Sequence, residues 1–103
     1  MSVLINFAMF PTDAGISKSQ QVSKVIEFIK NSGFEYRLNP MGTTIETDTM
    51  QEALDLVNQS YLLLEKDHDR VYSTITIDAR KGDKGRMKSK IESIEQKIGK
   101  VNS

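Results

Sequence analysis

The fold is decided by residues 34–46, Phe-Glu-Tyr-Arg-Leu-Asn-Pro-Met-Gly-Thr-Thr-Ile-Glu. Their pattern predicts two short strands joined by a tight turn. The turn is predicted at residues 39–42, since proline fixes φ near the value that a turn requires and Asn and Gly favour the outer positions. Alternation on both sides predicts that Tyr36, Leu38 and Ile45 face inward, with the residues between them facing outward. A hairpin of this size is not stable alone in water, so neighbouring segments must cover its apolar face.

The segment before the hairpin is predicted to form a strand and then a helix. Large apolar residues alternate along residues 3–10 and are expected to face the core: Val3, Ile5, Phe7 and Met9. Ser17 and Gln20 fit a capping box that would open the helix. The helix would bury residues at helical spacing, Val22, Val25, Ile26 and Ile29. Gly33 is expected to end it, because glycine accepts the left-handed conformation of a helix end.

The segment after the hairpin repeats this order and adds a last helix. Asp48 or Thr49 is expected to start a helix, with Glu52 completing a cap on Thr49. Its predicted apolar stripe is Met50, Ala53, Leu54, Val57, Tyr61 and Leu64. Residues 70–80 alternate most clearly of all and predict the fourth strand. A final helix would carry Met87, Ile91, Ile94 and Ile98 and stop at Gly99.

The predicted order is therefore β-α-β-β-α-β with an additional C-terminal helix. Its usual closure is the ferredoxin-like α+β sandwich, a four-stranded antiparallel sheet with two helices on one face and the first and third strands central. Periodicity alone leaves another α+β topology open. At 103 residues, the chain is expected to form a single domain over residues 1–103.

Composition and charge narrow the function classes. The formal net charge of zero argues against a dedicated nucleic-acid binder. The chain has no cysteine, which excludes disulfides, thiol nucleophiles and thiolate metal sites. No targeting or membrane segment is recognised, so a cytoplasmic protein without a membrane partner is expected.

The charges are unevenly distributed along the chain. Seven acidic residues lie between Glu46 and Asp69 against the single Lys66, and eight basic residues lie between Arg80 and Lys100 against three acidic ones. Two interpretations stay open: solvated helix faces, or complementary patches that orient subunits against each other.

The sheet face without helices would be mostly small and polar. It would carry Asn6, Ala8, Arg37, Thr44, Glu46, Tyr72, Thr74, Thr76, Asp78 and Arg80. An antiparallel sheet can leave such a face in water. Alternatively, two subunits that associate through it would enclose a polar recess. Glu46 and Asp78 would then place negative charge beside a bound cation.

The residues for catalysis or metal binding are sparse. His68, the only histidine, lies between two aspartates in a predicted solvated turn, and no metal site and no catalytic residue is expected. The Gly82–Arg86 loop lacks the spacing of a phosphate-binding loop. The strand order also occurs in RNA-recognition modules, but the open central strands lack the aromatic residues on which bases stack.

The chain resembles the small microbial thiamine-binding protein family over nearly its whole length. The resemblance rests on residues 7–11, 16–19, 36–46, 70–80 and 90–95, taken in that order. Its most specific part is the Pro-Met-Gly-Thr turn followed by Ile-Glu. The resemblance implies a ferredoxin-like subunit, assembly into homodimers or homotetramers, and non-catalytic binding of thiamine or its hydroxymethylpyrimidine part at subunit contacts.

The chemistry of the open face is compatible with such a ligand, and no cofactor is required. Glu46 and Asp78 are candidates for the thiazolium cation or the exocyclic amine. Thr44, Thr74, Thr76 and Asn6 are candidates for hydrogen bonds to the pyrimidine edge. Main-chain groups of Met41, Gly42 and Thr43 could approach the ligand because Gly42 has no side chain. Two alternatives stay open: a regulatory module that binds another small metabolite such as an amino acid, and an enzyme of unassigned activity.

Overall fold

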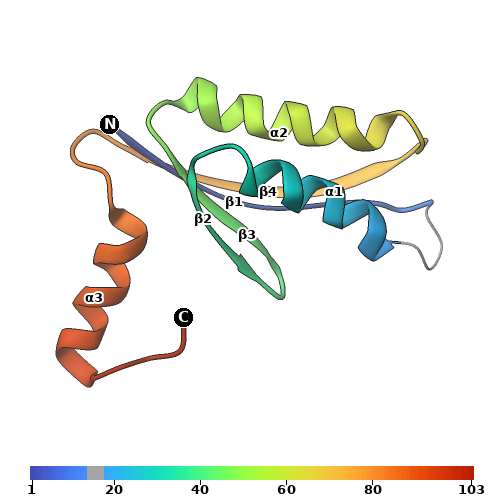
Figure 1. Ribbon diagram of the computed structural model, residues 1–103. Helices are drawn as coiled ribbons and strands as arrows, with labels where there is room; N and C mark the ends of the chain where they lie inside the picture. The colour runs from blue at the N-terminus through green and yellow to red at the C-terminus, as the bar shows by residue number, and fades with distance from the viewer. Residues whose placement is uncertain (14–17) are drawn as a thin grey trace.

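The elements follow the predicted order in the computed structural model, which describes residues 1–13 and 18–103 (Figure 1). Their bounds are β1 (Ser2–Pro11), α1 (Lys18–Lys30), β2 (Glu35–Asn39), β3 (Gly42–Thr47), α2 (Met50–Glu65), β4 (Val71–Arg80) and α3 (Arg86–Ile98). The α+β ferredoxin-like arrangement with an added C-terminal helix is confirmed. The predicted cap on Ser17 lies outside the described residues.

The four strands form one antiparallel sheet in the order β2-β3-β1-β4, so the first and third strands are central, as predicted. The register places Asn6 of β1 between Thr44 and Thr76, and places Leu4 between Glu46 and Asp78. Helices α1 and α2 lie on one face of the sheet and α3 lies on the other side, at one end (Figure 1). The sheet therefore has one covered face and one mainly open face.

The core lies between the covered face and the two helices. Its large, fully buried aliphatic side chains are Val3, Ile5, Ile29, Ile45 and Leu64. Burial of each such side chain stabilises the fold by about 1.5–3 kcal/mol. The alternation of residues 3–10 predicted this face of β1 correctly, because successive strand side chains point to opposite faces.

Helix α2 begins as predicted but turns a different face toward the core. Thr49 caps it, and the capping box with Glu52 is present. Its buried residues are Ala53, Leu56, Ser60 and Leu64, whereas the predicted stripe included Leu54 and Tyr61, which are 47% and 41% exposed. Ser60 can occupy a core position because its Oγ donates a hydrogen bond to the Leu56 carbonyl over 2.7 Å. Because Ser60 is polar, the apolar pattern of the sequence did not identify this buried face of α2.

The hairpin closes through Pro40 and Met41, between the paired residues Asn39 and Gly42. Asn39 Oδ1 accepts a hydrogen bond from the Met41 N–H over 2.8 Å, which fixes the turn locally. Tyr36 packs against the core as predicted, but Leu38 is 61% exposed because a hollow separates it from α1.

The contacts of helix α3 with the sheet lie in its N-terminal part, from Arg86 to Lys90. Met87 is buried, while Ile94 and Ile98, on the same predicted stripe, are 51% and 73% exposed. Among the described residues, none of the helices combines the length and the apolar character that a bilayer crossing requires.

Candidate functional site

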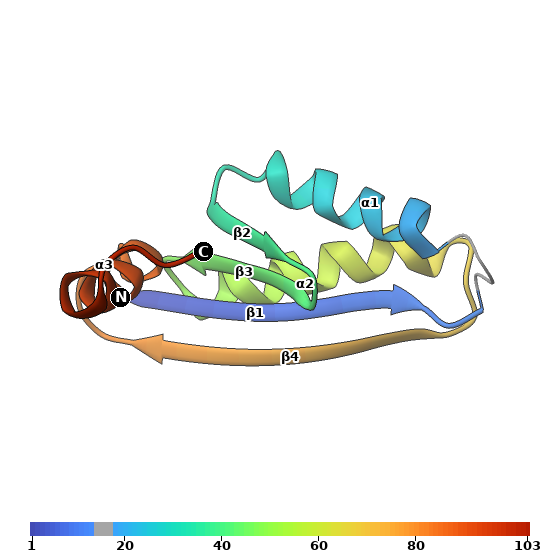
Figure 2. The ribbon, with the colours of Figure 1, turned by 90° about the horizontal axis from the view of Figure 1, so that it is seen from below.

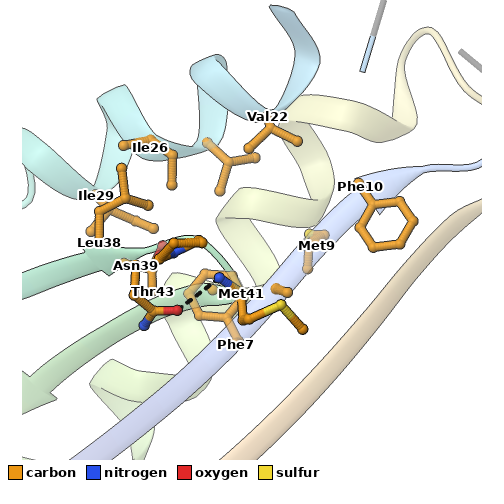
Figure 3. Close-up of a pocket in the computed structure, with 14 residues that line it drawn as sticks. Phe7, Met9, Phe10, Val22, Ile26, Ile29, Leu38, Asn39, Met41 and Thr43 are labelled. Carbon is orange, nitrogen blue, oxygen red and sulfur yellow. Dashed lines mark hydrogen bonds between the residues drawn. The ribbon is translucent and has the colours of Figure 1, made fainter. Parts of the chain in front are cut away.

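A cavity of about 350 Å³ lies between α1 and the tip of the β2–β3 hairpin (Figure 3). Its lining residues carry no charge: Phe7, Ala8, Met9, Phe10, Val22, Val25, Ile26, Ile29, Leu38, Asn39, Pro40, Met41, Gly42 and Thr43. This volume is at the lower end of the range for small-molecule sites, which are mostly apolar with a few polar groups. The cavity therefore suits a small, uncharged group.

Three elements build the walls of this cavity. The side chains of Val22, Ile26 and Ile29 point from α1 toward the hairpin and β1, because they recur at helical spacing on one side of α1 (Figure 3). Phe7 and Met9 contribute the floor from the covered face of β1. Met41, which is 85% exposed, lies at the mouth.

The polar groups of the cavity belong to the hairpin. Asn39 lines it with a side chain that is held by the Met41 N–H. Gly42 lies so close to β1 that an added Cβ would be 3.0 Å from the Phe7 carbonyl oxygen. Of the predicted site residues, the structure brings Met41, Gly42 and Thr43 together here. The helical spacing of Val22, Val25, Ile26 and Ile29 predicts only that they face the core. It does not predict that they also line a cavity.

A second group of predicted site residues lies on the open face. Thr44 Oγ1 donates a hydrogen bond to Asn6 Oδ1 over 3.0 Å, and Thr76 stands opposite Asn6 on the other side. Thr74 and Thr76 are exposed. These four residues form a polar row across β3, β1 and β4, on the side of the sheet opposite the cavity.

Glu46 is not exposed on the open face, so that expectation is wrong. The side chain lies beneath the first turn of α3 and the residue is only 5% exposed. Its carboxylate accepts hydrogen bonds from the Ser2 hydroxyl and from the backbone N–H groups of Gly85, Arg86 and Met87. Burial acts to raise the pKa of Glu46, but these hydrogen bonds outweigh it and lower the pKa below its ordinary value. Glu46 thus serves as the N-terminal cap of α3, and its role in ligand binding stays a prediction.

Asp78 is engaged by the same helix. Arg86 Nη1 donates to Asp78 Oδ2 over 2.8 Å, and Lys90 Nζ lies 3.6 Å from the same oxygen. The hydrogen bond and charge of Arg86 lower the pKa of Asp78, and Lys90 contributes in the same direction. Arg86 itself is 2% exposed and also donates to Ser2 Oγ and to the carbonyls of Ser2 and Asp78. Sequence reasoning missed this arginine, because nothing local distinguishes it from the basic loop before it.

The two predicted carboxylates are also remote from the cavity along the sheet. Both stand opposite Leu4, whereas the cavity is bounded by Phe7 to Phe10. At about 3.3 Å per residue, this offset amounts to roughly 10–20 Å along β1. Within one subunit, they therefore do not lie beside a ligand held in the cavity.

His68 also has a different environment from the predicted solvated turn. Its side chain is 8% exposed, and Nδ1 lies 3.0 Å from Asp13 Oδ1. The Asp69 N–H also donates to Asp13, and these contacts lower the pKa of Asp13. The pair joins the end of β1 to the loop before β4. Within the described ranges, no group of three or more His, Asp or Glu residues is placed to hold a metal ion.

The chain is similar to one protein family and to two of its archaeal relatives over most of its length. The family model described as "Thiamine-binding protein" matches residues 5–95. UPF0045 protein MJ1052 of Methanocaldococcus jannaschii is 32% identical over 92 residues, or 89% of this chain and 91% of its own. A UPF0045 protein of Methanothermobacter thermautotrophicus is 31% identical over 83 residues, covering 80% of this chain and 84% of its own.

Solved structures show the same fold. A crystal structure of the Methanocaldococcus jannaschii protein superposes with a TM-score of 0.80 at 30% identity, covering 92% of this chain and 97% of that one. A Thermotoga maritima protein, described as a candidate thiamine biosynthesis/salvage protein, superposes with a TM-score of 0.77 at 22% identity, covering 91% and 99%.

Proposed function

The chain belongs to the thiamine-binding protein family, and from this premise we propose that it binds thiamine or its hydroxymethylpyrimidine part without transforming it. The observation that carries the proposal is the uncharged cavity between α1 and the hairpin, built partly by Met41, Gly42 and Thr43. Among the described residues, its lining holds no histidine, lysine or carboxylate that would serve as a general base. This composition supports a binding role over a catalytic one.

The aminopyrimidine ring is the part of the ligand that this cavity fits. The ring is flat and uncharged near neutral pH, so it would not have to bring a charge into an apolar site. The half-buried side chains of Val22 and Ile26 offer apolar contacts to its faces. Backbone groups at the hairpin tip and the Asn39 amide are within the lining and would meet its donors and acceptors. The cationic thiazolium would remain toward the mouth.

Calorimetry with hydroxymethylpyrimidine, thiamine and thiamine diphosphate tests the proposal. We expect heat and thermal stabilisation with at least one of the first two ligands, because a ligand that binds only the folded state raises its stability. Weaker binding is expected for the diphosphate, since the lining residues that the structure describes include no cation to pair with it. Lys18 stands outside that lining, with Nζ 5.3 Å from the centre of the Phe10 ring. The absence of heat and of stabilisation with all three ligands would contradict a thiamine-related function.

Filling the cavity should remove binding while keeping the fold. We expect Val22→Phe to weaken hydroxymethylpyrimidine binding at least tenfold, because the added ring would occupy the ligand's space between α1 and the hairpin. Gln20→Phe is the matched control, since it adds a similar ring to an exposed position of the same helix. Titration calorimetry measures the affinity of both variants for hydroxymethylpyrimidine. If the two affinities were equal, the ligand would not bind in this cavity.

Self-association through the open face is a further part of the proposal. The exposed row of Thr74 and Thr76 beside Asn6 leaves space for a second sheet, which would bring Asp78 of one copy near its partner. We expect Thr76→Arg, or Thr74→Arg, to lower the molar mass measured by light scattering, because an unpaired charge would enter the contact. A mass identical to that of the original chain would show that the open face is free. A cytoplasmic location stays a prediction.

A further inference from the structure

We infer that the chain binds whole thiamine and that Glu27 selects it by facing the thiazolium ring. The cation lies in a second hollow, on the outer flank of α1, while the pyrimidine ring occupies the cavity described above. This inference rests on the proposed function and deepens it, because it identifies the ligand as the cationic compound with both rings and not as its neutral pyrimidine half.

The second hollow, of about 610 Å³, adjoins the cavity. Helix α1 lies along the β2 side of the sheet, away from β4 (Figure 2). The second hollow lies between the outer flank of this helix and Leu38 of β2. Both spaces are lined by Val22, Ile26 and Leu38, whose side chains are drawn in Figure 3. One methylene group joins the two rings of thiamine, so the rings need adjoining spaces of this kind.

The side chains between the two spaces are incompletely covered. Leu38 is 61% exposed, and Val22 and Ile26 are half-buried. A ligand that crosses from the cavity into the second hollow would remove apolar surface of all three from water, which favours binding in proportion to the area covered. A ligand confined to the cavity would leave the side of Leu38 that faces the second hollow in water.

The two spaces differ in charge. The described lining of the cavity is uncharged, whereas the second hollow is lined by Glu27 and Lys30 together with Ser19, Ser23 and Asn31. A permanent cation is costly to place in an apolar site without a partner. None of the ion pairs among the described residues involves Glu27. Its carboxylate is therefore available to the thiazolium, and the serine hydroxyls are available to the hydroxyethyl group of the ligand.

A lysine at the other end of the cavity favours the same orientation. Lys18 Nζ lies 5.3 Å from the centre of the Phe10 ring, and Phe10 lines the cavity. At 1.5 Å per residue, Glu27 lies about 13 Å further along the axis of α1. A thiazolium directed toward Phe10 would meet a charge of its own sign, whereas the reverse orientation brings it to a carboxylate. The charges of α1 thus direct the cation toward the second hollow.

Titration calorimetry on the full chain with thiamine and its thiophene analogue tests this assignment. The analogue has a carbon atom in place of the charged ring nitrogen and keeps the shape of the ligand. We expect Glu27→Gln to lower the affinity for thiamine about three- to fivefold, the upper range for an exposed ion pair. The affinities for the analogue and for hydroxymethylpyrimidine should not change. Because the protein and the ligand are varied together, the comparison isolates the contact between the two charges.

Two further variants serve as controls. Glu92→Gln makes the same change in net charge at an exposed position of α3, on the other side of the sheet, and should leave all three affinities unchanged. Lys30→Gln removes the cation from the second hollow and should not weaken thiamine binding, because the charge it removes repels the thiazolium. Circular dichroism would show that each variant is folded.

The results separate this inference from the proposed function. The inference is overturned if Glu27→Gln binds thiamine as tightly as Glu92→Gln does, or if Glu27→Gln weakens thiamine and the neutral analogue by the same factor. A loss of thiamine affinity in Lys30→Gln equal to that in Glu27→Gln would also overturn it. In each case the original chain would still bind its ligand, so the proposed function would stand. Absence of binding of all ligands by the original chain would overturn both.

Discussion

Replacing Glu46 by alanine should lower the free energy of unfolding by about 3–5 kcal/mol, because the change removes the acceptor of several buried hydrogen bonds. The Ser2 hydroxyl and the first N–H groups of α3 would lose their partner, and the buried Arg86 would keep its positive charge with only Asp78 to balance it. Urea unfolding at neutral pH measures this loss.

A matched control is available on the neighbouring strand. Glu35 pairs directly with Glu46 in the sheet register but is exposed, so Glu35→Ala should change stability by less than about 0.5 kcal/mol. Glu46→Gln should fall between the two, since an amide oxygen still accepts hydrogen bonds but lacks the charge. If Glu46→Ala were as mild as Glu35→Ala, the capping role derived for Glu46 would be wrong.

The same carboxylates make stability depend on pH in a defined direction. The pKa values of Glu46 and Asp78 are both lowered in the folded protein. Their stabilising contribution is therefore complete above the pKa values of the unfolded chain and is lost as the pH falls through those of the folded chain. The urea midpoint of the original chain should fall between pH 5 and pH 3, and it should fall less in Glu46→Gln, which has one of these groups removed.

Replacing Gly42 by valine should cost about 2–3 kcal/mol of stability and also weaken ligand binding. A Cβ at this position would lie 3.0 Å from the Phe7 carbonyl oxygen, and a backbone atom of the central strand β1 cannot move aside as a flexible side chain can. The hairpin would have to shift away from β1. This shift would move the cavity wall that Gly42 and Thr43 form and would change the contacts offered to the ligand. Thermal unfolding and calorimetry with hydroxymethylpyrimidine measure the two effects.

The control for Gly42 lies next to it in the turn. Met41 is 85% exposed, so Met41→Val should be nearly neutral for stability although it changes the same hairpin. Gly42→Ala should show a smaller loss than valine, because it adds one carbon at the same contact. If Gly42→Val folded as stably as the original chain, the close approach of the hairpin to β1 could not be required.

Much of the fold was predictable because it depends on patterns within single elements. The alternation along β1 identified its core face, and the Thr49–Glu52 pair identified the start of α2, since a capping box involves neighbours three residues apart. The same local reasoning mistook the face of α2. A helix that carries apolar residues on two sides, as at Leu54 and at Leu56, does not indicate which side the sheet will cover.

The candidate site was predictable only in part, for a related reason. The turn at Met41, Gly42 and Thr43 was recognised from its own residues, but its pairing with Val22 and Ile26 of α1 joins segments far apart in the chain. The strand parity of Glu46 was also right, since it does point to the side of the sheet without α1 and α2. Its burial was not foreseen, because α3 returns from residues 86–98 to cover that end.

The sequence by itself determined the order of the elements, the sides to which strand residues point and the turn that closes the hairpin, because these follow from periodicity and from neighbours a few residues apart. Only the tertiary structure decided which polar groups stay in water and which flank of a helix is covered. Those outcomes depend on contacts between distant segments, such as Ser2 with Arg86, where burial and hydrogen-bond partners are set together.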